Sequence, residues 1–186
     1  MCVLIFKPKG VNMPTKRIIK ACCQANPHGF GFATMSGLFY KTLDRNDFIE
    51  TLYSNVGVED DVMIHCRLAT HGSICEANCH PFERNGIIFA HNGILNIEPI
   101  GDKTDSETAF IKHIYPVVKR YGLQSDETTY LVMSLIGSSK FCIFDTDDMT
   151  IRLFGAYEKI EGVYYSNTRF LYYMRQPKRA CHNYII

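Results

Sequence analysis

Strand-like segments at both ends of the chain, with helix-like segments between them, restrict its fold more than any other feature. Alternating and β-branched residues predict strands over residues 2–7, 30–35, 38–43, 62–69, 87–91, 140–146, 150–155 and 162–166. Apolar residues at helical spacing predict helices over residues 15–23, 47–54, 105–121, with a bend near Pro116, and 126–135. This order predicts an α+β fold in which two sheets pack face to face and helices cover their outer faces.

The composition limits the number of domains and the class of partner. A chain of 186 residues with 46% hydrophobic residues can bury one core, so we predict a single domain over residues 1–186. The net charge of +1 and the scattered basic residues argue against binding to nucleic acid or to an anionic membrane surface. No signal-peptide pattern and no long apolar stretch is present, which predicts a cytoplasmic protein with its eight cysteines reduced.

Cys2 is the first candidate for a catalytic residue. A small residue after the initiator Met normally allows an aminopeptidase to remove that Met, which would leave Cys2 with both a thiol and a free α-amine. The ordinary pKa values of these groups are about 8.5 and about 7.7 to 8.0, so the amine can act as a base toward the thiol. This pairing resembles the nucleophile of threonine with an N-terminal amine. The alternative is that Cys2 is only a small apolar residue at the start of a strand.

Three further segments carry groups that suit one amino-acid substrate. Arg67 and Thr70 follow a predicted strand, where a guanidinium can bind a carboxylate at two points and a hydroxyl can assist. Asn92 and Gly93 could donate to an oxyanion, or could form only a tight turn. Asp105 could hold an ammonium group, or could only cap its helix. With Cys2, these groups are what the hydrolysis of the side-chain amide of free glutamine requires.

The order of these motifs carries a family resemblance. Cys2, NPHGFGFA, HCRLATHG, NCHPF, AHNG and TDSE occur in that order over residues 2 to about 110, and GVYYSN follows near the end. In this the chain resembles the class II glutamine amidotransferase (glutaminase) domain of the N-terminal-nucleophile hydrolases, which is found in glucosamine-6-phosphate synthase and amidophosphoribosyltransferase. The resemblance implies a four-layer αββα sandwich of two mainly antiparallel sheets, with L-glutamine as substrate and no cofactor.

The resemblance also implies a role for each matched residue. Cys2 would be the nucleophile, and Asn92 and Gly93 would form the oxyanion hole. Arg67 and Thr70 would bind the carboxylate of glutamine, and Asp105 would bind its α-amino group. The remaining two, His71 and His80, would line or brace the pocket.

The chain departs from the family pattern at several positions. His28 stands where related stand-alone domains often have Asp, and Cys66, Cys75 and Cys79 have no role in the pattern. The sequence ends at Ile186 without the second domain that uses ammonia in the large synthases, and its opening KPKGVNMP resembles stand-alone members encoded by bacteria and bacteriophages. The ammonia is expected to pass to an acceptor or to a separate synthase subunit, which the motifs do not identify.

Two alternatives stay open at this point. One is a structural zinc module, because histidines and cysteines crowd into residues 65–80: His65, Cys66, His71, Cys75, Cys79 and His80. The absence of a CxxC pair in this segment argues against zinc. The other is the same fold acting on an amide other than glutamine, or serving as an inactive binding domain. The pair Arg67 and Asp105 favours a free α-amino acid, because the two charges would hold its carboxylate and its ammonium group separately.

Overall fold

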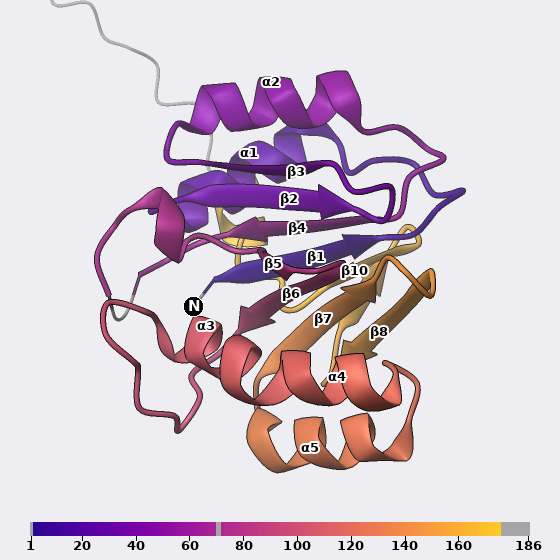
Figure 1. Cartoon of the computed structure of the whole chain (residues 1–186). Helices are drawn as coiled ribbons and strands as arrows, with labels where there is room; N and C mark the ends of the chain where they lie inside the picture. The colour runs from indigo at the N-terminus through magenta and orange to yellow at the C-terminus, as the bar shows by residue number, and fades with distance from the viewer. Residues whose placement is uncertain (1, 70–71, 176–186) are drawn as a thin grey trace, which may run out of the picture.

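Two antiparallel sheets pack face to face between two layers of helices (Figure 1), in a computed structural model that describes residues 2–69 and 72–175. The first sheet has the strand order β3-β2-β4-β1-β10-β9. Its strands are β1 (Val3–Lys7), β2 (Phe30–Thr34), β3 (Phe39–Thr42), β4 (Val62–Cys66), β9 (Glu158–Ile160) and β10 (Val163–Tyr165). The second sheet has the order β5-β6-β7-β8 and is formed by β5 (Phe82–Arg84), β6 (Ile87–Asn92), β7 (Lys140–Asp145) and β8 (Thr150–Phe154).

Helices cover the outer face of each sheet. The first sheet is covered by α1 (Lys16–Ala25) and α2 (Arg45–Asn55), with α6 (Leu171–Arg175) packed beside α1. The second sheet is covered by α3 (Asp105–Ala109), the π-helical turn η2 (Phe110–Ile114), α4 (Tyr115–Tyr121) and α5 (Asp126–Ile136). A short 3₁₀ turn, η1 (Glu76–Asn78), lies in the loop between β4 and β5. The predicted α+β sandwich with four αββα layers is therefore confirmed.

Strand β1 shows why the central strands are apolar throughout. Val3 and Ile5 belong to the core between the first sheet and its helices, whereas Leu4 and Phe6 belong to the core between the two sheets. Successive side chains of a strand point to opposite faces, and here both faces are covered. The whole strand is consequently buried.

The structure corrects several predicted boundaries. The predicted helix over residues 105–121 is divided into α3, η2 and α4, and the π-helical turn lies directly before Pro116. A proline ring collides with the carbonyl four residues earlier in a regular helix, and a wider turn relieves that collision. Strand β4 ends at Cys66 and not at residue 69, and β5, β9, η1 and α6 were not predicted. Asn92 and Gly93 do not form a hairpin turn, because β6 pairs with β5 and with the distant β7.

The register of the first sheet brings the ends of several strands to one edge. β1 pairs antiparallel with β4, so that Val3 lies opposite Cys66, and it pairs antiparallel with β10, so that Ile5 lies opposite Tyr165. The residue before β1 and the residues after β4 and β10 therefore meet at the same edge of the sheet. The candidate site lies at this edge.

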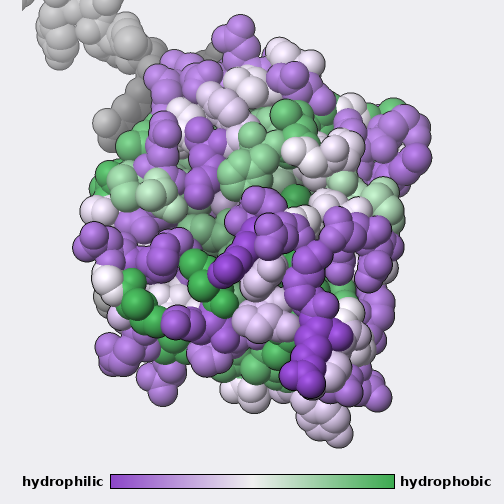
Figure 2. Space-filling model, in the orientation of Figure 1, coloured by the Kyte–Doolittle hydropathy of each residue, from purple (hydrophilic) through white to green (hydrophobic). Residues whose placement is uncertain are grey.

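The surface is mixed in character. Figure 2 shows polar side chains over most of one face of the molecule, with apolar side chains scattered among them. Among residues 2–69 and 72–175, no helix combines the length and the apolar character that crossing a bilayer requires.

Candidate active site

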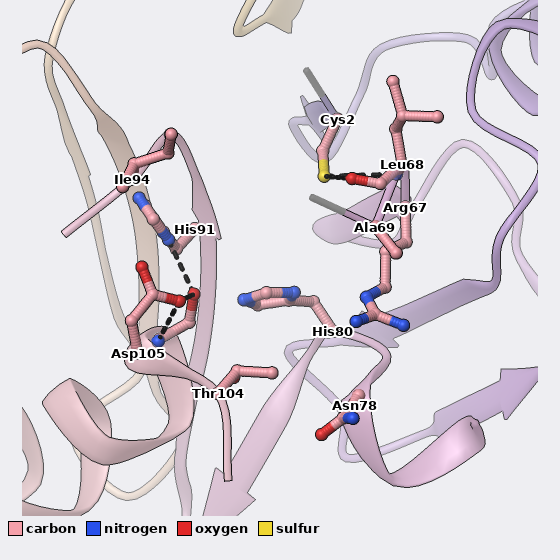
Figure 3. A pocket seen from close by; sticks show the side chains of 12 residues that line it. Cys2, Arg67, Leu68, Ala69, Asn78, His80, His91, Ile94, Thr104 and Asp105 are labelled. Atoms are coloured by element: carbon pink, nitrogen blue, oxygen red, sulfur yellow. Dashed lines mark hydrogen bonds between the residues drawn. The ribbon is translucent and has the colours of Figure 1, made fainter. Parts of the chain in front are cut away.

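One pocket at this edge brings together most of the site residues predicted from the sequence (Figure 3). Five segments contribute its lining: the residue before β1, the residues directly after β4, the loop around η1, the end of β6 and the start of α3. The described residues that line it are Cys2, Arg67, Leu68, Ala69, Asn78, His80, His91, Gly93, Ile94, Thr104, Asp105 and Ser106. Thr70 and His71 lie outside the described residues, so their predicted roles stay predictions.

The Cys2 thiol faces the loop that follows β4. The backbone N–H of Leu68 donates to Cys2 Sγ at 3.3 Å, and the thiol lies 3.5 Å from Leu68 O. Burial raises the pKa of the Cys2 thiol, while the backbone N–H of Leu68 and the charge of Arg67 act in the opposite direction. A thiol whose pKa is raised is protonated near neutral pH. It therefore needs a nearby base before it can act as a nucleophile.

Arg67 is the first residue after β4, and its side chain is buried beside the pocket. Its Nη1 donates to Ser73 O at 2.9 Å, which ties the guanidinium to the loop that precedes η1. His28 holds the chain two residues further on, because Ala69 N donates to His28 Nδ1 at 3.0 Å. Arg67 and Ala69 are thus each held by a hydrogen bond to another segment.

Gly93 lines the pocket, and its position excludes any side chain. Its φ is +149°, and an added Cβ would lie 2.1 Å from Ser139 Oγ and 3.0 Å from His91 Nε2. The backbone at this position can therefore approach a ligand closely.

The Asn92 side chain is buried beside the pocket and does not line it. Its Nδ2 donates to Ser166 Oγ at 2.8 Å, and its Oδ1 faces no hydrogen-bond donor among the described residues. The described residues show no acceptor for the second N–H of this amide, and the predicted role of Asn92 as an oxyanion donor stays a prediction.

The Asp105 carboxylate is held on several sides at the pocket wall. Its Oδ2 accepts from Leu95 N at 2.9 Å, and its Oδ1 accepts from Ser106 N at 2.7 Å and from Ser106 Oγ at 3.1 Å. The capping residue of α3 is not Asp105, because the Thr104 side chain accepts from Glu107 N. Asp105 therefore presents an oriented negative charge to the pocket.

Three buried histidines cluster at the pocket, and two of them, His80 and His91, line it. The rings of His65 and His80 lie 4.4 Å apart between centroids, and those of His80 and His91 lie 6.3 Å apart. Figure 3 shows the His80 ring between the side of Cys2 and Arg67 and the side of His91 and Asp105. His91 Nδ1 lies 2.8 Å from Ser106 Oγ. His65 Nε2 lies 3.2 Å from the backbone oxygen of His91.

Burial keeps these histidines neutral. It lowers the pKa of His65 to about 3 and that of His91 to about 4, the latter against the opposing effect of the Asp105 carboxylate. Burial also lowers the pKa of His80 well below its ordinary value, and the neighbouring His65 and His91 act in the same direction. His80 therefore lines the pocket as a neutral group, and its predicted role in bracing the pocket stays a prediction.

The cysteines of the proposed zinc cluster are separated in space. Cys66 points to the helix side of β4, where its Sγ lies 3.9 Å from that of Cys23, whereas the neighbouring His65 points to the opposite face. Cys79 packs against the backbone at Gly29, where an added Cβ would lie 2.2 Å from the sulfur. Within residues 2–69 and 72–175, no group of three or more His, Cys, Asp or Glu side chains could hold a metal ion.

The comparisons with known proteins agree with this geometry. Residues 49–139 match the family described as "Glutamine amidotransferases class-II". The glutamine–fructose-6-phosphate aminotransferase (isomerizing) of Rhizobium leguminosarum bv. viciae is 26% identical over 152 residues, which are 72% of this chain and 25% of that protein. The corresponding enzyme of Pseudomonas syringae pv. tomato is 30% identical over 102 residues, which are 54% of this chain and 14% of that protein.

A solved structure shares the fold. It is described as the structure of the allosteric regulatory enzyme of purine biosynthesis, with a TM-score of 0.57, 18% identity, and coverage of 89% of this chain and 41% of that chain. The likeness to this structure concerns the fold, and the sequence matches make the chain similar to class II glutamine amidotransferases over residues 49–139. The present chain spans a quarter or less of the two aminotransferases.

Several pocket residues were missed in the sequence. Asn78, His91 and Ser106 stand inside the motifs NCHPF, AHNG and TDSE, where only their neighbours received roles. Asn78 Nδ2 donates to Ser73 O and to Ser73 Oγ, so it supports the loop that also holds Arg67. Their positions in the motifs were the available signal.

The histidine cluster predicts acid sensitivity. An unfolded chain takes up protons on histidine below about pH 6.5, whereas the folded chain does not until the pH approaches about 4 for His91. The free energy of unfolding, measured with urea, should therefore fall as the pH is lowered from about 6.5 toward 5. His80→Leu should reduce this fall, and replacement of the exposed His113 by Leu should leave it unchanged. Equal falls in all three proteins would contradict the neutral cluster.

Proposed function

We propose that this chain is a class II glutaminase, which hydrolyses the side-chain amide of L-glutamine to glutamate and ammonia through a thioester on Cys2. The observation that carries the proposal is the convergence of Cys2, Arg67, Gly93 and Asp105 on one pocket from four separate segments. We also propose that residues 1–186 form one domain of this kind.

Arg67 and Asp105 would hold the two charged ends of the amino acid. The guanidinium at the end of β4 suits the α-carboxylate, and the oriented carboxylate of Asp105 suits the α-ammonium group. Because the two groups approach from different segments, a free amino acid satisfies both, whereas a peptide-bonded glutamine lacks the two charges. Thr70 and His71 are proposed to complete this side of the pocket.

The chemical step requires a base for the thiol, whose pKa is raised by burial. In the mature chain the α-amine of Cys2 would take the thiol proton, and the thiolate would attack the carboxamide carbon. Gly93 N–H and the Asn92 amide would donate to the oxyanion of the tetrahedral intermediate. The protonated amine would then return its proton to the carboxamide nitrogen, which leaves as ammonia as the C–N bond breaks. Water would hydrolyse the γ-glutamyl thioester to glutamate and the free thiol.

The destination of the ammonia lies outside the glutaminase fold. We propose that a synthase active site consumes it, either on another part of a longer chain or on a separate subunit. The second arrangement would be that of a stand-alone protein of the bacterial or bacteriophage type. We further propose a cytoplasmic location. The seven described cysteines are all free thiols, as expected in a reducing compartment.

A glutamine-mimicking diazoketone should alkylate Cys2, because this thiol alone would lie beside both a base and an oxyanion hole. Peptide mapping by mass spectrometry after partial reaction checks the position of the label. Excess L-glutamine should slow the labelling, and Cys2→Ala should abolish both the label and glutamate release while the chain stays folded.

Cys75 provides an internal control for this experiment. It is partly exposed, and the Ser73 hydroxyl lowers the pKa of its thiol, so a simple reagent such as iodoacetamide should modify it readily. Glutamine should not protect Cys75. A diazoketone label that lies mainly on Cys75, with or without glutamine, would contradict the assignment of Cys2.

Steady-state kinetics should separate the oxyanion donor from the charge clamp. Asn92→Ala should lower kcat by roughly 10² to 10³ with little change in KM, because the oxyanion exists only in the transition state and the intermediates. Arg67→Gln and Asp105→Asn should mainly raise KM, because they hold the substrate before reaction. Similar changes in KM at all three positions would mean that Asn92 contributes only to the shape of the site.

A further inference from the structure

Ser166, the residue after β10, joins the strand of the nucleophile to the predicted oxyanion donor. Its Oγ accepts from Leu4 N at 2.8 Å and from Asn92 Nδ2 at 2.8 Å, and its own N donates to Leu4 O at 2.8 Å. The neighbouring Asn167 donates through Nδ2 to Cys2 O at 2.8 Å. All four side-chain and backbone contacts connect residues that are far apart in sequence.

The hydrogen bond from Leu4 fixes the position of the Ser166 oxygen. Leu4 lies within the paired region of β1, and Ser166 returns a backbone hydrogen bond to it, so the serine is held at both its backbone and its side chain. Ser166 is buried, with 4% of its surface exposed. Its oxygen is therefore a fixed acceptor and not a mobile surface hydroxyl.

That fixed acceptor determines the direction of the Asn92 amide. The NH₂ group of an amide is planar, so holding one N–H on Ser166 Oγ also sets the direction of the other. Among the described residues, the Asn92 oxygen faces no donor, so the hydrogen bond to Ser166 is the one that orients this side-chain amide. Without it, no hydrogen bond among the described residues would set the rotation of this buried amide about its Cβ–Cγ bond.

We propose that Ser166 is the positioning residue of the oxyanion hole: it orients the Asn92 amide and ties it to β1, the strand that carries Cys2. The inference rests on the proposed glutaminase function and deepens it. Ser166 itself touches neither the substrate nor the reacting atoms. Its effect on turnover depends on Asn92, so this effect can be separated by experiment from any effect of Ser166 on packing or stability.

A double-mutant cycle between Ser166 and Asn92 tests this, with the mature chain and L-glutamine as substrate. Ser166→Ala should lower kcat by roughly tenfold, the factor expected for loss of one orienting hydrogen bond, and should change KM by less than about twofold. In the Asn92→Ala background the same substitution should have no further effect on kcat. Ser166→Cys keeps nearly the same side-chain volume with a weakly accepting sulfur, and should repeat the loss if the alanine variant is poorly folded.

Ser125→Ala is the control for the loss of a serine hydrogen bond away from the pocket. The partly buried Ser125 caps α5 and donates to Gly122 O, so its substitution should lower the free energy of unfolding and leave kcat unchanged. If Ser166→Ala lowers kcat by the same factor in the wild-type and in the Asn92→Ala background, the inference is overturned while the glutaminase function stands. Wild-type turnover in Ser166→Ala would also overturn it. An unsubstituted chain that releases no glutamate would refute the proposed function, and the inference with it.

Discussion

The antiparallel pairing of β1 with β4 is the interaction on which the rest of the site depends. Because Val3 lies opposite Cys66, the residue that precedes β1 lies beside the residues that follow β4. Cys2 therefore meets Leu68 and Arg67 without any long loop. The pairing of β1 with β10 adds Ser166 and Asn167 on the other side, so the start of the chain is held by hydrogen bonds from both neighbouring strands.

Burial gives the pocket its chemical character. It raises the pKa of the Cys2 thiol and keeps His65, His80 and His91 neutral. The formal charges at the pocket are then those of Arg67 and Asp105, which approach from different segments. Such a pocket suits a molecule that carries one charge of each sign. Among its described residues, the Asp105 carboxylate is hydrogen-bonded to Leu95 N and to Ser106, whereas the Cys2 thiol contacts the backbone of Leu68. This arrangement favours the α-amine of Cys2 as the base.

Much of the fold and of the candidate site could be predicted from the sequence, because the motifs are short and their residues lie at the ends of strands. The sandwich followed from strand patterns at both ends of the chain, and Cys2, Arg67, Gly93 and Asp105 do line one pocket. The partner of Asn92 could not be predicted, since Ser166 is 74 residues away and is brought near by the pairing of β1 with β10. An irregularity near Pro116 was predicted, but the form that it takes, a π-helical turn, depends on local backbone geometry that apolar spacing does not report.

One part of the sequence could have been interpreted further. His65 and Cys66 are neighbours on a predicted strand, so their side chains must point to opposite faces, and they could not have ligated the same ion without a break in the strand. The structure shows this separation, with Cys66 near Cys23 and His65 facing the second sheet. Clusters of potential ligands within a strand therefore need the alternation of the strand to be considered before a metal is inferred.

In the proposed mechanism the free α-amine of Cys2 activates its own thiol. This can be tested by comparing glutamate release by two preparations of the same chain, one that begins at Cys2 and one that retains Met1, with the N-terminus of each established by intact mass. Turnover is expected only in the chain that begins at Cys2, because an amide nitrogen at Cys2 is not basic. Full activity in a preparation shown by mass to retain Met1 would contradict it.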